Sequence, residues 1–368
     1  MKFSIARTDM LAALSRINRV VDHDDKILIS NNVLIRLSTD ASKVAFTAVN
    51  SVMEIEVTAS AEGYVSGATT VPAKFIYEIA RRLPDGSKIT MDTNDRSMKV
   101  RAGRSSYSLQ TLPEADFPSF SIGTFDNKIN LGMSDVKHLF GRVTFAAADD
   151  IRMYLTGVYL TKEGGFLRAA ATDGHRLTQY DLETYGDRNT AFNVIVPRRT
   201  ANEICLLANE TDSTAVVETS PTRIKFTSGN TSLLSRLIDG KFPDYERIIP
   251  LGNDKIFDVN RLALSGAVRR VTAVASEGWF PIKMEAAEDL LKISGTDPIT
   301  GNLAKEEIDI EYGDALVQVG FNSRYLDEVL NLIGGETVTL KLNDAVSAVL
   351  LSDKDDDRAL YVLMPTRL

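Results

Sequence analysis

The sequence predicts an α+β fold of three similar domains, each with two helices packed on antiparallel sheets. Six segments have helical periodicity, and their starts are separated by 61 to 66 residues, so a unit of about sixty residues repeats along the chain. Short runs that alternate apolar and polar residues lie between these segments, as is typical of half-buried strands. Each unit therefore has one helix and about four strands, and two units make a domain of ordinary size.

The predicted helices begin at recognisable start signals. Pro72 and Pro197 stand at or just before a first turn, and Ser134-Asp135 is a plausible cap for the third helix. The predicted helices are residues 7–21, 73–83, 134–148, 197–209, 258–275 and 322–333. The clearest predicted strands are residues 33–37, 43–49, 53–59, 98–102, 166–171, 223–227 and 337–342.

Two stretches rich in turn residues, 121–128 and 250–255, separate the pairs of units. We therefore expect domains at residues 1–124, 125–254 and 255–368.

The composition indicates a globular protein without a disulfide framework or a zinc motif. Hydrophobic residues make up 44% of the chain and charged residues 25%. Cys205 is the single cysteine, and the histidines at 23, 138 and 175 lack metal-ligand spacing. The first five residues alternate as a strand does, unlike a signal peptide, and no run approaches the roughly 18 apolar residues of a membrane span. We expect a cytoplasmic protein that needs no cofactor or metal.

Charge is distributed unevenly between the helices and the rest of the chain. The six predicted helices carry 14 Lys and Arg against 7 Asp and Glu, whereas the remainder carries 28 against 43. Arginine is a good helix former, which offers one explanation. If the helices line one surface, that surface is basic on an acidic body and attracts a phosphate backbone without reading sequence. The helices lack aromatic stacking platforms, so duplex is the expected ligand rather than single strands.

Residues 171–177, Ala-Thr-Asp-Gly-His-Arg-Leu, predict a strand, a turn and a second strand. Asp173-Gly174 is typical of a two-residue hairpin turn. Asp173, His175 and Arg176 also suggest acid-base chemistry, but neighbouring strand residues point to opposite faces and no nucleophile motif accompanies them. A hydrolytic or acid-base enzyme that uses these three residues stays the alternative function, and a sequence-specific DNA-binding protein is a weaker one.

Six motifs in collinear order resemble the β subunit of bacterial DNA polymerase III, the sliding clamp family. The segment 171–177 is one of them, and the C-terminal Tyr-Val-Leu-Met-Pro-Thr-Arg-Leu at 361–368 is another. The others are Gly-Ala-Thr-Thr-Val-Pro-Ala-Lys at 67–74, Thr-Leu-Pro-Glu-Ala-Asp-Phe-Pro at 111–118, Leu-Ile-Asp-Gly-Lys-Phe-Pro-Asp-Tyr at 237–245 and Gly-Phe-Asn-Ser-Arg-Tyr at 320–325.

The resemblance implies three clamp-type domains that dimerise head-to-tail into a closed ring, with helices inside and sheets outside. It implies a non-enzymatic processivity factor that encircles double-stranded DNA and tethers the replicative polymerase. Its partners would be the catalytic subunit of DNA polymerase III, the clamp loader, repair polymerases and mismatch-repair factors.

The resemblance also implies a pocket for short hydrophobic motifs of these partners. A flexible methionine over an apolar floor suits such a site. Carried over position by position, the pocket residues are Leu155, Thr172, Gly174, His175, Arg176, Leu177, Pro243, Arg247, Ile248, Val346, Val362, Met364 and Pro365.

For DNA contact, the resemblance and the helix charges point to a set of basic residues and one tyrosine. They are Arg7, Arg16, Arg82, Lys137, Arg142, Arg152, Tyr154, Arg198, Arg199 and Arg269. The chain departs from the family pattern at two loops: residues 22–26 are mostly acidic where an arginine is frequent, and residues 149–154 keep only part of the usual contact set.

For the dimer, the resemblance pairs an edge strand of the first domain with one of the third. Tyr107 and Leu109 would face Ala273 and Val274, which are smaller than the Ile and Leu of the best-known member. The basic side would be Lys74, Arg96, Arg101 and Arg104, and the acidic side Glu306, Glu307, Asp309 and Glu311. Because of the smaller residues and a thinner acidic run, we expect a weaker or more salt-sensitive dimer.

Overall fold

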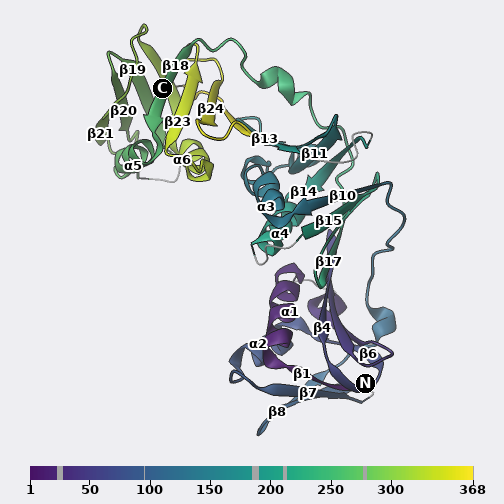
Figure 1. Cartoon of the computed structure of the whole chain (residues 1–368). Coiled ribbons are helices and arrows are strands. Elements are labelled where there is room, and N and C mark those ends of the chain that lie inside the picture. The colour runs from purple at the N-terminus through teal and green to yellow at the C-terminus, as the bar shows by residue number, and fades with distance from the viewer. Residues whose placement is uncertain (23–27, 95, 185–189, 210–213, 277–279, 368) are drawn as a thin grey trace. The chain divides into compact units, whose positions relative to one another are not determined.

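The computed structural model describes residues 1–22, 28–94, 96–184, 190–209, 214–276 and 280–367 (Figure 1). The chain divides into two compact units, one made of Met1–Lys137 and Arg199–Leu237 and the other of His138–Arg198 and Ile238–Leu368. The predicted α+β class is confirmed, because every sheet is antiparallel and the six principal helices stand between strands.

The first unit begins with a helix whose apolar residues recur at helical spacing. In α1 (Arg7–Val20), Met10, Ala13, Leu14, Ile17 and Val20 are buried, so one stripe packs inward. The helix α2 (Ala73–Arg82) follows Pro72, which occupies its N-cap. A five-stranded sheet in the order β5-β1-β7-β8-β9 belongs to this unit. Its strands are β1 Lys2–Ala6, β5 Glu62–Val65, β7 Lys88–Thr93, β8 Ser97–Ala102 and β9 Ser105–Gln110.

An eight-stranded sheet in the first unit joins strands from both sides of the predicted boundary near residue 124. Its order is β10-β15-β16-β17-β4-β3-β2-β6, and the pairing of β17 with β4 makes the join. The strands are β2 Asn32–Leu37, β3 Lys43–Val49, β4 Met53–Ser60, β6 Gly67–Pro72, β10 Asn127–Gly132, β15 Thr214–Thr219, β16 Arg223–Ser228 and β17 Thr231–Arg236.

The second unit contains the corresponding eight-stranded sheet, in the order β14-β11-β12-β13-β25-β24-β23-β18. Here β13 pairs with β25, so strands from the middle of the chain continue into strands from its C-terminus. The strands are β11 Gly157–Glu163, β12 Phe166–Thr172, β13 Arg176–Glu183, β14 Phe192–Pro197, β18 Lys255–Asn260, β23 Thr337–Leu342, β24 Val349–Asp353 and β25 Ala359–Leu363.

A four-stranded sheet, β21-β20-β19-β22, and two helices complete the second unit. Asn260 caps α5 (Arg261–Thr272) by accepting a hydrogen bond from the Ala263 backbone, and Asn322 caps α6 (Ser323–Leu332) in the same way. The strands are β19 Pro281–Ala287, β20 Leu290–Thr296, β21 Leu303–Asp309 and β22 Val317–Asn322.

The third and fourth helices are α3 (Met133–Gly141) and α4 (Arg198–Ala208). The predicted extension of α3 to residue 148 is wrong, because the helix ends at Gly141 and a short 3-10 turn, Thr144–Ala146, follows. The Thr144 hydroxyl donates to the Phe140 carbonyl at 2.6 Å, and such a side-chain bond competes with the helical backbone pattern. The predicted cap also shifts, because Ser134 and Asp135 lie inside the first turn.

Candidate functional site

Strand pairing brings the segment 171–177 beside the C-terminal tail. In the register of β13 with β25, Leu177 lies opposite Val362 and Arg176 opposite Leu363. One residue further, the Met364 backbone N–H donates to the His175 carbonyl at 2.9 Å. Two motifs nearly 190 residues apart in sequence therefore lie side by side in the second unit.

The predicted floor of the pocket belongs to one apolar cluster. Leu155, Leu177 and Val362 are buried together with Ala148, Ala170, Ile195, Phe242 and Tyr245. Four of the thirteen predicted pocket residues, Leu155, Thr172, Leu177 and Val362, are thus buried, and the others form the rim.

The turn between β12 and β13 is centred on Gly174 and His175, one residue later than the predicted Asp173-Gly174, because Thr172 pairs with Leu177 and the Asp173 backbone N–H donates to the Arg176 carbonyl at 3.4 Å. Side-chain oxygens hold it. The Thr172 hydroxyl accepts from the Gly174 N–H and donates to the Arg176 carbonyl, and the Asp173 carboxylate accepts from the backbone N–H groups of His175 and Arg176. Gly174 has φ of 88°, a conformation that glycine adopts without strain.

Arg176 anchors this turn to two other elements. Its guanidinium lies 4.4 Å from the ring centre of Tyr325 on α6 and 4.9 Å from that of Phe145. It also pairs with Asp173 and with Glu328 of α6. Burial raises the pKa of Glu328, but hydrogen bonds from Arg176 and Arg324 outweigh this and leave it below its ordinary value. The His175 ring stacks on Tyr325 at 6.3 Å between centres, so both rim residues rest on α6.

The remaining predicted pocket residues lie at the surface of the same unit. Met364 and Ile248 are 40% and 45% exposed, and Val346 is 77% exposed. Val346 and Pro365 line a common groove of about 680 Å³. Pro243 and Arg247 are exposed on the segment that leads from Phe242 to the short 3-10 helix Tyr245–Ile248.

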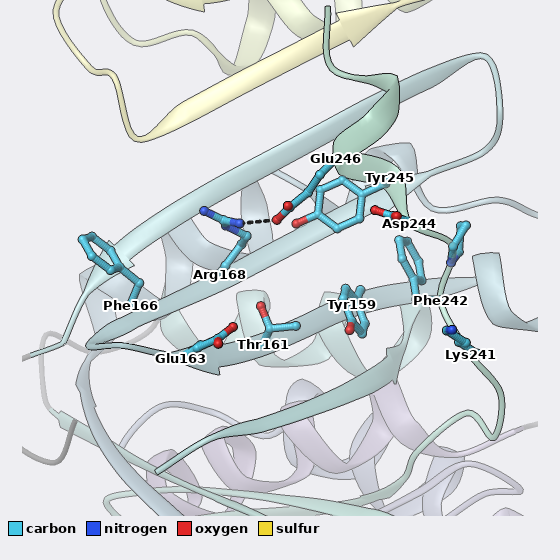
Figure 2. A pocket seen from close by; sticks show the side chains of 11 residues that line it. Tyr159, Thr161, Glu163, Phe166, Arg168, Lys241, Phe242, Asp244, Tyr245 and Glu246 are labelled. Carbon is cyan, nitrogen blue, oxygen red and sulfur yellow. Dashed lines mark hydrogen bonds and ion pairs between the residues drawn. The ribbon is translucent and has the colours of Figure 1, made fainter. Parts of the chain in front are cut away.

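Three contributors were missing from the sequence prediction. Tyr325 is the last residue of the motif 320–325, and its place in that motif was the only sequence feature that could have pointed to it. Glu328 and Phe145 carry no local signal, because their role depends on contacts that the fold creates. A second pocket, near Phe242, was also unforeseen (Figure 2).

Many of the predicted DNA-facing arginines pair with carboxylates of the same chain. Arg7 pairs with Asp85, Arg82 with Glu78, Arg152 with Asp150, Arg199 with Asp22 and Arg269 with Asp327. Arg142 lies 3.8 Å from Asp356, and Arg16 donates to Asn230 and Thr231. Lys137 and Arg198 make no ion pair with a described residue. Tyr154 is 39% exposed. The acidic loop lies mostly outside the described residues, which end at Asp22 and resume at Leu28.

Two sheets end in strands with an unpaired edge, and these strands carry four of the predicted dimer residues. β9 carries Tyr107 and Leu109 and is the last strand of the five-stranded sheet. β21 carries Glu306 and Glu307 and is the outermost strand of the four-stranded sheet. Arg96, Arg104 and Lys74 are exposed in the first unit, whereas Ala273 is exposed and Val274 half-buried just after α5. Glu306 already pairs with Arg270 at 2.8 Å, which lowers its pKa.

The geometry does not assemble an acid-base site from Asp173, His175 and Arg176. The Asp173 carboxylate accepts hydrogen bonds from the turn backbone and from the Arg176 guanidinium, and the His175 ring packs against Tyr325. Within the described ranges, no three His, Cys, Asp or Glu side chains gather as a metal site would require. No described helix is both long and apolar enough to cross a membrane.

Comparisons with known proteins agree along the whole chain. Family models of the DNA polymerase III β subunit match as N-terminal domain at residues 1–121, central domain at 130–244 and C-terminal domain at 246–367. The beta sliding clamps of Pseudomonas aeruginosa and Escherichia coli K12 are 34% and 33% identical, each over the full length of both chains. The solved β subunit of P. aeruginosa has a TM-score of 0.95 at 34% identity, and a Bartonella birtlesii sliding clamp bound to griselimycin has 0.96 at 34%, again over 100% of both chains.

Proposed function

The chain belongs to the family of the bacterial DNA polymerase III β subunit, and from this membership we propose which of its surfaces do the work of a sliding clamp. The protein is a processivity factor of DNA replication and has no enzymatic role. DNA and polymerase are its partners, and members of the family close into a dimeric ring. A polymerase tethered to the clamp rebinds the DNA at a high effective concentration of polymerase, so that it need not return from solution.

The peptide pocket, as we name the thirteen residues carried over above, is proposed to receive the hydrophobic motifs of partners. The observation that carries this proposal is the pairing of β13 with β25, which joins Met364 to His175 by a backbone hydrogen bond and sets Leu177 of the floor opposite Val362. Apolar side chains of a motif would bury against that floor. The exposed Met364 would close over them, since its unbranched side chain adapts to different shapes.

Binding of a labelled peptide tests this. The probe is a fluorescein-labelled heptapeptide with two leucines and a phenylalanine, followed by anisotropy. Met364→Ala should weaken binding about tenfold, or roughly 1.4 kcal/mol, because it removes apolar contact area. Leu316→Ala, which shortens an exposed apolar side chain elsewhere in the second unit, should leave binding unchanged. Unlabelled griselimycin should displace the probe. Equal affinity of the Met364 variant and the wild type would contradict the proposal.

The dimer is proposed to form by adding β21 of one copy to β9 of the other. Both are edge strands with free backbone groups, one flanked by arginines and the other bearing carboxylates. Tyr107 and Leu109 point to the same side of β9, because they are two residues apart. Arg270 already pairs with Glu306 and would compete with the arginines of the other copy for this carboxylate, which supports the expectation of a salt-sensitive interface.

DNA binding is proposed to be weak and independent of sequence. Nine of the ten predicted residues are Lys or Arg and supply positive charge, but most of their guanidinium groups already have a carboxylate or carbonyl partner. A closed ring needs only a weakly attractive bore, because topology holds it on the duplex. We also propose that a clamp loader opens this ring, that repair polymerases and mismatch-repair factors share the peptide pocket, and that the protein works in the cytoplasm.

A further inference from the structure

A second pocket lies on the same sheet face as the floor of the peptide pocket. Cross-strand pairs place Tyr159 opposite Ala170, Thr161 opposite Arg168, and Glu163 opposite Phe166. On the next strand Thr172 lies opposite Leu177, which is on the same face as Ala170 because strand residues two apart share a face. One end of this face thus carries Leu177 and the other carries Glu163 and Phe166.

The segment 241–246 crosses the face between these two ends and forms one wall of the second pocket. Phe242 stacks on Tyr159 with ring centres 4.7 Å apart and planes 1° from parallel. Tyr245 meets both rings edge-on. Figure 2 shows Tyr159, Thr161 and Glu163 in a row along β11, with Phe166 at the opposite end from Phe242. The pocket has a volume of about 470 Å³.

The wall is continuous with the peptide pocket. Phe242 and Tyr245 are buried in the same apolar cluster as Leu155, Leu177 and Val362. Pro243 belongs to the proposed peptide pocket and also lines the second one. A partner segment that leaves the peptide pocket over Pro243 therefore enters a space that is already formed.

The charges of the second pocket favour a basic occupant. The Arg168 guanidinium forms ion pairs with Asp181 at 2.7 Å and with Glu246 at 2.7 Å. Lys241 is the other cation of the lining, whereas Glu163, Asp244 and Glu246 are carboxylates. Arg168 is neutralised by Asp181 and Glu246, and Asp244 pairs with Arg247 at 2.7 Å, so among the described residues Glu163 is the lining carboxylate that has no ion pair, and it is exposed to solvent. Phe166, 46% exposed, offers apolar surface beside it.

We propose that this second pocket binds a short segment of the same partner protein, beyond its hydrophobic motif, that carries a Lys or Arg next to an aromatic side chain. The cation would lie against Glu163 and the aromatic ring against Phe166 and Tyr159. The inference rests on the proposed function of the peptide pocket, because the motif brings the segment to its site at high effective concentration.

Three versions of the labelled heptapeptide test the proposal. One is the motif alone, one adds Lys-Phe-Lys after a six-residue Gly-Ser spacer, and one adds Glu-Phe-Glu after the same spacer. Each extension is made at the N-terminus and, in a separate set, at the C-terminus. All are titrated against the full chain, against Glu163→Lys, and against Glu336→Lys as a control on an exposed glutamate outside the pocket.

From one terminus, the Lys-Phe-Lys peptide should bind the wild type and the Glu336 variant roughly three- to tenfold more tightly than the Glu-Phe-Glu peptide. Glu163→Lys should remove or reverse this preference while the motif alone binds as before. Equal affinity of both extended peptides from either terminus would overturn the inference and leave the peptide pocket standing. An equal loss of preference in the Glu336 variant would show that the preference comes from the overall charge of the protein and not from the second pocket, and would overturn the inference. Failure of the motif alone to bind would overturn both proposals.

Discussion

Arg176, on the rim of the peptide pocket, and Glu328, on α6, are joined by an ion pair although 152 residues separate them in the chain. The Arg176 side chain is only 10% exposed, and its guanidinium is also held between two aromatic rings. The pair therefore fixes the turn of residues 173–175 against α6, and with it the shape of the pocket rim.

Glu328→Gln should loosen that rim. Removing the Glu328 charge costs more than removing an exposed charge, because the mostly buried Arg176 guanidinium keeps Asp173 as a partner but loses its ion pair with α6. We expect motif-peptide affinity to fall roughly three- to tenfold and the melting temperature to fall by roughly 2–8 °C. Glu336→Gln, on an exposed residue, should change neither in anisotropy or calorimetry. An unchanged Glu328 variant would mean that the rim holds its shape without the pair.

The Glu328 pair also predicts a pH dependence. The pKa of Glu328 in the folded protein is lowered below its ordinary value of 4.5, so the stability that its charge contributes is present above that value and is lost as the pH falls through the folded-state pKa. The gap in melting temperature between wild type and Glu328→Gln should therefore close as the pH falls below about 4.5. A gap that stays constant down to pH 3 would contradict this assignment.

Tyr107→Asp should break the proposed dimer, because it places a charge in the apolar centre of β9. Tyr64→Asp is the matched control, since Tyr64 is 62% exposed on β5, the opposite edge of the same sheet. Sedimentation should show monomers for the first variant and wild-type mass for the second. For the wild type, we expect the dissociation constant to rise with salt. A subnanomolar value at physiological salt would refute the expectation of a weak dimer.

Cys205 should react slowly with thiol reagents. It lies on α4, and burial raises its pKa to about 12, so the reactive thiolate is scarce at neutral pH. Iodoacetamide at pH 7.5 should label the folded chain far more slowly than the chain in denaturant, as read by intact mass. Labelling at the same rate in both would show that the thiol is accessible.

The sequence predicted those features that depend on local pattern. The apolar stripe of Met10, Ala13, Leu14 and Ile17 identified α1 to within one residue of its end, because the spacing of apolar residues along a helix can be read directly from the sequence. The early end of α3 was missed, because the apolar pattern continues through the 3-10 turn Thr144–Ala146 that follows the helix. The resemblance placed His175 and Met364 in one pocket, and a backbone hydrogen bond joins the two residues in the structure, while their role in binding stays a prediction. The approach of Glu328 to Arg176, and of Phe242 to Tyr159, could not be predicted, because these contacts arise only when distant segments pack.

The pairing of β17 with β4 shows a further limit of the sequence prediction. Turn-rich composition suggested a boundary near residue 124, yet the sheet continues across it. Backbone pairing between distant strands leaves no compositional trace, so the domain limits stay a prediction.

The central claim is that the protein encircles DNA, and retention after loading tests it most directly. The protein would be loaded with a purified bacterial clamp loader and ATP onto nicked circular plasmid and onto the same plasmid linearised. Salt would be high enough to weaken phosphate contacts. We predict retention on the circle and rapid loss from the linear ends, with native mass confirming the dimer. Equal, salt-sensitive retention on both would show ordinary electrostatic binding and would contradict the ring.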